Sequence, residues 1–170
     1  AYIQAKKKIF DDLPAGAFAL FNTDDKHGAI MVQNTKAATH NFALKMPAAF
    51  MAKVLTNTLQ GLELCIANQS VWVQLVGIFN AYNVLAAYAT ACLLGANGYE
   101  VLTALSALPP IRGRLQCMRA KTGFDAIVDY AHTPDALKHV LATLTQVKNK
   151  NGHIITVLGC GGNRDKKKRP

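Results

Sequence analysis

The sequence lacks several features that would place it in a specialised class of proteins. Its cysteines are few and widely spaced (Cys65, Cys92, Cys117 and Cys160), and they form no C-x-x-C pair. This spacing argues against a zinc ribbon or a disulfide framework. The sequence also has no run of 18 uncharged apolar residues, and its first residues have no hydrophobic stretch typical of a signal peptide. We therefore expect a protein of the reducing cytoplasm with no membrane partner.

Acidic residues are also scarce. Ten aspartates and glutamates stand against nineteen lysines and arginines, which gives a formal net charge of +9 and raises the question of nucleic-acid binding. However, eight of the basic residues lie in two clusters, 6–8 and 164–169, and residues 46–110 contain only Lys53. A nucleic-acid surface more often carries its charge as a stripe interleaved with aromatic residues. A non-catalytic basic nucleic-acid-binding module is therefore kept as the alternative to a site for small phosphorylated or carboxylated ligands.

Apolar residues make up 51% of the 170 residues, enough to bury one domain-sized core or parts of two. Residues 17–25 are predicted to form a buried strand that leads into an Asp-rich turn, and residues 29–35 to form the next strand. In residues 50–76, apolar and polar residues alternate loosely, and Gly61 and residues 67–69 interrupt the alternation with turn-forming residues. This pattern predicts two or three antiparallel strands.

The second half of the sequence predicts helices alternating with strands. A helix is expected over 80–95, and a second over 99–108 that stops at Pro109-Pro110, where helix continuation is sterically blocked. The two prolines are the best candidate for a domain boundary. Beyond them we predict strands at 115–119 and 124–130, a helix at 134–147 and a strand at 153–159. Strand, helix and strand would form a βαβ unit, the opening of a parallel α/β domain.

Both ends of the sequence look cut. The first residues are helical in pattern with no capping residue before them, and Pro170 falls where a helix is expected after a glycine-rich turn. One βαβ unit cannot form a covered parallel sheet by itself. We therefore expect an internal piece of a longer chain.

The segment GCGGNRDKKKRP (159–170) directly follows a predicted strand, so its glycines can turn at the edge where open α/β sheets bind ligands. Arg164 next to Asp165 supports a ligand loop, because a guanidinium group suits a carboxylate or a phosphate. The alternative is a glycine turn with no ligand.

The segment IVDYAHTPDAL (127–137) places Asp129 at a strand end and His132 and Thr133 where a helix begins. Polar groups at this turn are expected to face the same crevice as the glycine-rich loop, because the strands of a βαβ unit are parallel. The simpler interpretation is that Thr133 caps the helix, with Pro134 in its first position and His132 an ordinary surface residue.

Asn80 and Asn83 are spaced to lie on one face of a first helical turn. Asparagine carries both a donor and an acceptor, the combination that reads the N6–N7 edge of adenine. From the pattern alone, however, Asn80 is better explained as a helix N-cap.

Six segments occur in the order found in the Mur ligases: YIQAKKKIF at 2–10, NTDD at 22–25, GIFNAYNVLAAYAT at 77–90, GRLQ at 113–116, DYAHTPDAL at 129–137 and GCGGNRDKKKRP at 159–170. The sequence resembles this family over nearly its whole length, least distinctively at 41–76. DYAHTP and the final block are highly specific together, and they resemble the members that add the third amino acid to UDP-muramoyl-dipeptide.

The resemblance implies roles for individual residues. Lys6 matches the lysine whose carbamate helps to hold Mg²⁺ at the phosphates. A carbamate offers the hard oxygen ligands that this ion prefers. Asn80 and Asn83 match the adenine-binding asparagines, with Asn83 the stronger candidate. Arg164, with Asp165 beside it, matches the residue that binds a carboxylate of the incoming amino acid.

Four more residues match the family near the domain junction. Arg114 matches an arginine that contacts the nucleotide, and Asp129 an acid that binds the ribose hydroxyls. Tyr130 and His132 would line the same nucleotide and substrate crevice.

The resemblance implies an α/β fold in which residues 1–111 are the back half of a central ATPase domain and 112–170 the start of a Rossmann-like C-terminal domain. The implied reaction uses ATP and Mg²⁺ to activate the carboxylate of a UDP-muramoyl-dipeptide as an acyl phosphate, which a diamino acid, diaminopimelate or lysine, then attacks. The family's phosphate-binding loop would lie upstream of residue 1, so we expect no turnover by this chain alone. A folylpolyglutamate synthase-like ligase is the second reading within the superfamily.

Overall fold

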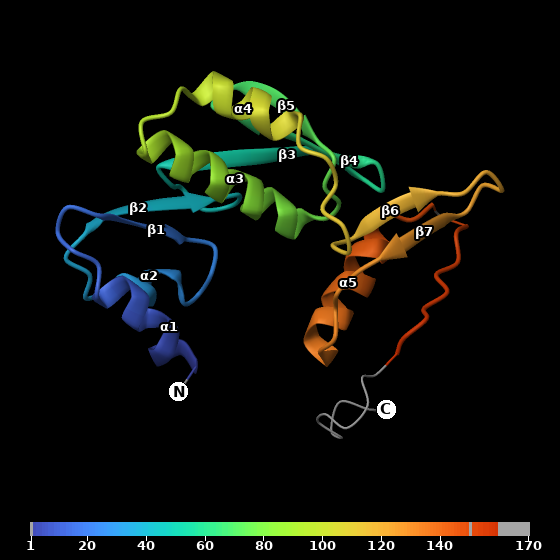
Figure 1. The fold of residues 1–170 in the computed structure, drawn as a ribbon, viewed down its shortest axis with the longest axis horizontal. Helices are drawn as coiled ribbons and strands as arrows, with labels where there is room; N and C mark the ends of the chain where they lie inside the picture. Colours follow the sequence, from blue (N-terminus) through green and yellow to red (C-terminus); the bar gives the residue numbers. More distant parts are fainter. Residues whose placement is uncertain (1, 150, 160–170) are drawn as a thin grey trace.

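The computed structural model describes residues 2–149 and 151–159, which form two sheets with five helices around them (Figure 1). The larger sheet has the order β1-β2-β3-β4-β5. The strands β1 (Phe18–Asn22), β2 (Ala38–Ala43) and β3 (Phe50–Thr58) are parallel, and β4 (Gly61–Ile66) and β5 (Gln69–Val73) continue the sheet antiparallel. The smaller sheet pairs β6 (Gln116–Arg119) with β7 (Asp125–Val128) antiparallel.

The helices are α1 (Tyr2–Asp11), α2 (Gly28–Met31), α3 (Ile78–Leu93), α4 (Gly98–Ser106) and α5 (Pro134–Val147). Helix α3 crosses one face of the larger sheet, with α4 beside it against β5 (Figure 1). Helix α1 packs on α2 beside β1, and α5 lies with the smaller sheet at the other side of the view (Figure 1). None of the helices within the described ranges has the length and apolar character to cross a membrane.

The core of the larger sheet follows from the period-2 pattern of β4. Leu62, Leu64 and Ile66 alternate along this strand, and each is at most 1% exposed. They meet the buried stripe of α3, in which Leu85 is fully buried and Ala81 lies one helical turn earlier. This packing fixes which side of α3 faces away from the sheet, and therefore where its polar side chains lie.

Most of the predicted elements are confirmed. The strand at 17–25, the antiparallel strands within 50–76 and the helices at 80–95, 99–108 and 134–147 are all present with small shifts of their ends. Gly95 follows α3 with a φ of 92° and ends the helix as expected, since its N–H donates to Cys92 O. The predicted α/β class is confirmed.

The predicted strand at 29–35 is wrong. Residues 28–31 form the short helix α2, and the neighbour of β1 is β2, a segment the sequence pattern did not single out. A hydrogen bond from His27 N to Asp25 Oδ1 bends the chain back after β1, and Gly28 lies so close to Asn22 O that a Cβ would sit 1.9 Å from it. A short apolar run is compatible with both a strand and a helical turn, so its pattern does not distinguish them. Here the hydrogen bond of His27 N and the close approach of Gly28 to Asn22 favour the helical turn.

The predicted strand at 153–159, and with it the βαβ unit, is also not formed within the described residues. The segment runs beside β7 and α5 without joining a ladder, and Ile155 and Val157 are at least 90% exposed. A parallel strand needs a neighbour on its hydrogen-bonding edge and cover on both faces. The residues described here provide β7 with one strand partner, β6, which is antiparallel.

The two sheets are joined by a small apolar cluster. Val76 before α3, Leu115 before β6 and Leu144 on α5 are each at most 9% exposed and pack together. Gly77 allows this contact, because a Cβ there would lie 2.7 Å from Thr143 Cγ2, and its φ of 94° is one that glycine adopts without strain. The start of α3 is thereby placed against α5.

Candidate functional site

Asp129, directly after β7, holds together two turns at the junction of the sheets. Its Oδ2 accepts a hydrogen bond from Leu115 N at 2.8 Å, and its Oδ1 accepts one from Ala131 N at 2.7 Å. Leu115 has a positive φ of 42°, a strained conformation that this charge-assisted bond helps to maintain. One carboxylate therefore sets the backbone on both sides of the candidate site.

Three exposed side chains gather on this support. The Arg114 guanidinium lies 4.8 Å from the centre of the Tyr130 ring, within the range of a cation–π contact. The Tyr130 ring in turn meets the His132 ring edge-on, with centroids 4.9 Å apart, and His132 Nδ1 lies 3.1 Å from Tyr130 O. Tyr130 is 61% exposed, so the cluster offers an aromatic face, a cation and an imidazole to a ligand.

The structure thus brings together four residues singled out from the sequence: Arg114, Asp129, Tyr130 and His132. Thr133 caps α5 as predicted, with its hydroxyl accepting from Ala136 N at 3.2 Å and Pro134 at the helix start. A cavity of about 420 Å³ opens beside them between β7, α5 and the segment 152–157, and Asp129 lies in its wall.

Asn80 and Asn83 form a second group, on the first two turns of α3. The predicted N-cap role of Asn80 is wrong: the helix is preceded by Gly77, and Asn80 is a buried residue of the first turn. Its Nδ2 donates to Val76 O at 2.8 Å, and its Oδ1 accepts from Asn83 Nδ2 at 3.0 Å. Asn80 therefore orients Asn83, which keeps its own carbonyl oxygen and one amide hydrogen for another partner.

Lys6 is exposed on α1 and belongs to neither group. Helix α1 lies at the opposite side of the view from α5, and α3 is drawn above the space between them (Figure 1). The adjacent Lys7 is buried and pairs with Asp11 one turn later. Arg164 and Asp165 lie outside the described residues.

The role of Asp24, which lies after β1 within the NTDD motif, was not predicted from the sequence. Its carboxylate accepts three hydrogen bonds from the backbone of residues 44–46 and one from the Tyr82 hydroxyl on α3. Burial raises the pKa of Asp24, but the bonds from Leu44, Met46, Tyr82 and Lys45 outweigh it and lower the pKa below its usual value. Burial and the contact with Asp24 raise the pKa of Tyr82 to about 12. These partners are 20 to 58 residues away in sequence, so no local pattern reveals them.

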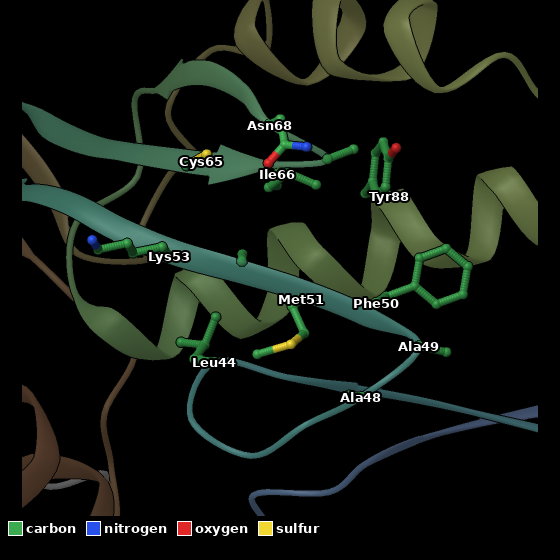
Figure 2. A pocket seen from close by; sticks show the side chains of 12 residues that line it. Leu44, Ala48, Ala49, Phe50, Met51, Lys53, Cys65, Ile66, Asn68 and Tyr88 are labelled. Carbon is green, nitrogen blue, oxygen red and sulfur yellow. The ribbon is translucent and has the colours of Figure 1, made fainter.

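A second cavity, of about 790 Å³ and thus larger than the one beside Asp129, contains none of the predicted site residues (Figure 2). It lies beside β3, the loop before that strand and the end of β4, and Tyr88 of α3 forms part of its wall (Figure 2). Its wall is largely apolar, with Lys53, Cys65 and Asn68 at its polar positions. Size alone therefore does not identify the site, and the junction cluster remains the better candidate for a charged ligand.

The described residues fit the two expected cofactors unequally. The junction cluster and Asn83 offer the stacking face, the cation and the amide that a nucleotide needs. By contrast, no group of three or more His, Cys, Asp or Glu side chains in residues 2–149 and 151–159 is placed to hold a metal ion. A magnesium ion held by the carbamate of Lys6 would therefore need further ligands from outside these residues.

Comparison with known proteins decides the family. Residues 1–91 match the profile of the Mur ligase middle domain, and residues 113–170 match that of the Mur ligase glutamate ligase domain. The chain belongs to the Mur ligase family. The resemblance seen in the sequence motifs is thereby confirmed.

Several relatives within the Mur ligases carry the same protein name. The chain is 54% identical over 169 residues to the UDP-N-acetylmuramoyl-L-alanyl-D-glutamate--2,6-diaminopimelate ligase of Phocaeicola vulgatus, covering 99% of this chain and 35% of the relative. It is 38% identical over 180 residues to the ligase of that name from Bacillus velezensis, covering 99% of this chain and 36% of the relative. The chain thus spans about a third of the length of these curated relatives.

Solved Mur ligase structures have the same fold. A structure of a UDP-N-acetylmuramoyl-L-alanyl-D-glutamate--2,6-diaminopimelate ligase superposes with a TM-score of 0.67 at 30% identity, covering 99% of this chain and 36% of that one. A folylpolyglutamate synthase from Thermotoga maritima gives a TM-score of 0.57 at 15% identity, covering 69% of this chain and 28% of that one. The latter is a likeness of fold alone.

Proposed function

We propose that this chain is the nucleotide-binding and domain-junction part of an ATP-dependent amide ligase of peptidoglycan precursor synthesis. The ligase adds a diamino acid, meso-diaminopimelate, to UDP-MurNAc-L-Ala-D-Glu. The observation that carries this proposal is the convergence of Arg114, Asp129, Tyr130 and His132 at one exposed place beside a cavity. The names of the relatives, which are 47–54% identical over 99% of the chain, support the choice of substrate.

The nucleotide is read by side chains in distinct roles. Asn83 presents an amide oxygen and an amide N–H to the adenine edge, held in place by Asn80. Asp129 uses the remaining lone pairs of its carboxylate to accept the ribose hydroxyls, since each oxygen has one backbone donor in the structure. Arg114 brings a positive charge toward the phosphates, and Tyr130 and His132 line the crevice beside it.

In the proposed reaction, the terminal carboxylate of the dipeptide attacks the γ-phosphoryl group of ATP, giving an acyl phosphate and ADP. The amino group of the diamino acid then attacks the acyl carbon, and phosphate leaves as the amide forms. Catalysis of this kind rests chiefly on positioning and on neutralising the phosphoryl charge. Mg²⁺, when bound, supplies part of that neutralisation, and Lys6 as a carbamate is its proposed ligand in this chain.

The remaining assignments belong to the same proposal. Residues 1–111 are the back part of the central ATP-binding domain, and residues 112–170 begin the C-terminal domain. Arg164, with Asp165, binds a carboxylate of the incoming amino acid. The substrates are soluble nucleotide-linked precursors, so we place the reaction in the cytoplasm, with no nucleic-acid or membrane partner.

The test is ATP-dependent phosphate release with UDP-muramoyl-dipeptide and either diaminopimelate or lysine. It is run on this chain and on a version extended upstream through the phosphate loop. We expect turnover only from the extended version, and with diaminopimelate. Turnover with a folate and glutamate instead would favour the folylpolyglutamate synthase reading. Failure of both versions, together with nucleic-acid affinity that falls steeply with salt, would replace the ligase by a basic binding module.

A further inference from the structure

Asp24 joins three segments that are distant in sequence at the carboxyl ends of β1 and β2. It follows β1, and its carboxylate accepts from the consecutive N–H groups of Leu44, Lys45 and Met46 after β2, at 2.7, 3.0 and 2.9 Å. It also accepts from the Tyr82 hydroxyl on α3 at 2.9 Å. Consecutive backbone N–H groups form a concave anion-binding arrangement, and here the anion is the protein's own carboxylate.

The position of Tyr82 in α3 gives this contact its importance. Tyr82 stands between Asn80 and Asn83 in the first two turns of the helix. Successive residues of an α-helix are about 100° apart around its axis, so fixing Tyr82 also fixes the direction in which Asn83 points. Packing of the buried stripe of α3 sets which side of the helix faces the sheet. The bond to Asp24 adds a directional restraint that ties this rotation to the ends of β1 and β2, the edge at which open α/β sheets bind ligands.

The start of α3 is also tied to β3 and to the residue before the helix. Gly77 N donates to Asn57 Oδ1 of β3 at 3.3 Å, and Asn80 Nδ2 donates to Val76 O. These bonds fix where the helix begins, but they lie at its first turn and leave its rotation further along to packing. Tyr82 supplies a directional, charge-assisted bond there, which is about twice as strong as a neutral one.

We propose that Asp24, acting through Tyr82, is a positioning residue that aims Asn83 at the adenine ring. Neither side chain needs to touch the nucleotide for this. The inference rests on the proposed function, since it presumes that Asn83 reads adenine.

The test uses the full-length ligase, including its phosphate loop, with the substitution Tyr82→Phe. This change removes one oxygen and keeps the ring packed. We expect KM for ATP to rise about three- to tenfold, the effect of one lost hydrogen bond, with kcat within about twofold of wild type. An adenine contact is made equally in the ground state and the transition state, so its loss shows in KM. The preference for ATP over GTP is expected to fall as well.

The matched control is Tyr99→Phe, which removes the same atom from a side chain that is 71% exposed on α4. It should leave both constants unchanged. A double-mutant cycle with Asp24→Asn isolates the contact: in the Asp24→Asn background, Tyr82→Phe should have little further effect on KM.

The outcomes separate the inference from the function on which it rests. An active wild type whose Tyr82→Phe variant has the ATP KM of the Tyr99→Phe control overturns the positioning role alone. Additive effects of Tyr82→Phe and Asp24→Asn overturn it too, as does a loss confined to kcat. A wild-type full-length protein without ligase turnover overturns the proposed function and this inference together.

Discussion

Replacing Asn80 by alanine should destabilise the fold around the larger sheet more than the loss of one surface asparagine would. Asn80 is 7% exposed, donates to Val76 O at 2.8 Å and accepts from Asn83 Nδ2 at 3.0 Å. Losing the bond to the exposed Asn83 costs about 1 kcal/mol, and leaving the buried acceptor Val76 O without its donor costs about 1–3 kcal/mol. Together these give an expected loss of about 2–4 kcal/mol in the free energy of unfolding.

Urea unfolding, followed by circular dichroism and by the fluorescence of Trp72, would measure this loss. Trp72 is the single tryptophan and lies on β5, within the same sheet that α3 covers. The control is Asn34→Ala in the exposed turn after α2, which should change stability by less than about 0.5 kcal/mol. If Asn80→Ala loses no more than this control, the buried bonds of Asn80 do not stabilise the start of α3, and the proposed orientation of Asn83 fails with them.

Three further measurements test the packing, the cap and the acid response. Leu85→Ala empties a fully buried site between α3 and β4 and should cost about 2–5 kcal/mol in urea unfolding. Thr133→Ala removes the cap of α5 and should cost about 1 kcal/mol, whereas Thr133→Ser should keep most of it. Hydrogen bonds hold the pKa of Asp24 below its usual 3.8, so its stabilisation is fully present above pH 3.8 and is lost as the pH falls toward the folded-state pKa. The stability advantage of wild type over Asp24→Asn should therefore be constant from pH 7 to about 4 and shrink below it; an advantage unchanged at pH 2 would contradict the assignment.

The features that the sequence predicted well are local ones. Helix α5 was expected over 134–147 and is found there, because Thr133 caps it and Pro134 has the φ angle of a first helical residue. The pairing of Asn80 with Asn83 follows from their i, i+3 spacing in the same way. In each case the residues that decide the structure lie within one helical turn of each other.

Strand pairing depends on partners far along the chain, and here the sequence patterns failed. Strand β2 begins with the largely polar stretch ATHN. This stretch has no alternation of apolar and polar residues from which its pairing with β1 could be predicted. Conversely, the apolar HIITVLG segment has a strand pattern but no ladder among the described residues. A sequence pattern indicates which residues suit a strand. The hydrogen-bonded ladder, however, forms only where a second strand lies alongside with a free edge.

The candidate site shows the same limit and explains why its residues act as a unit. The carboxylate of Asp129 accepts hydrogen bonds from Leu115 N and Ala131 N. Arg114 and Tyr130 are the residues directly before these two donors. The Arg114–Tyr130 contact therefore exists because one carboxylate fixes both backbones, a relation that the separate GRLQ and DYAHTP motifs do not reveal. It follows that replacing Asp129 should displace the guanidinium and the ring as well as remove the proposed ribose acceptor. The effects of substitutions at these three positions on nucleotide affinity should consequently be non-additive, and the loss at Asp129 cannot be read as the strength of one ribose contact.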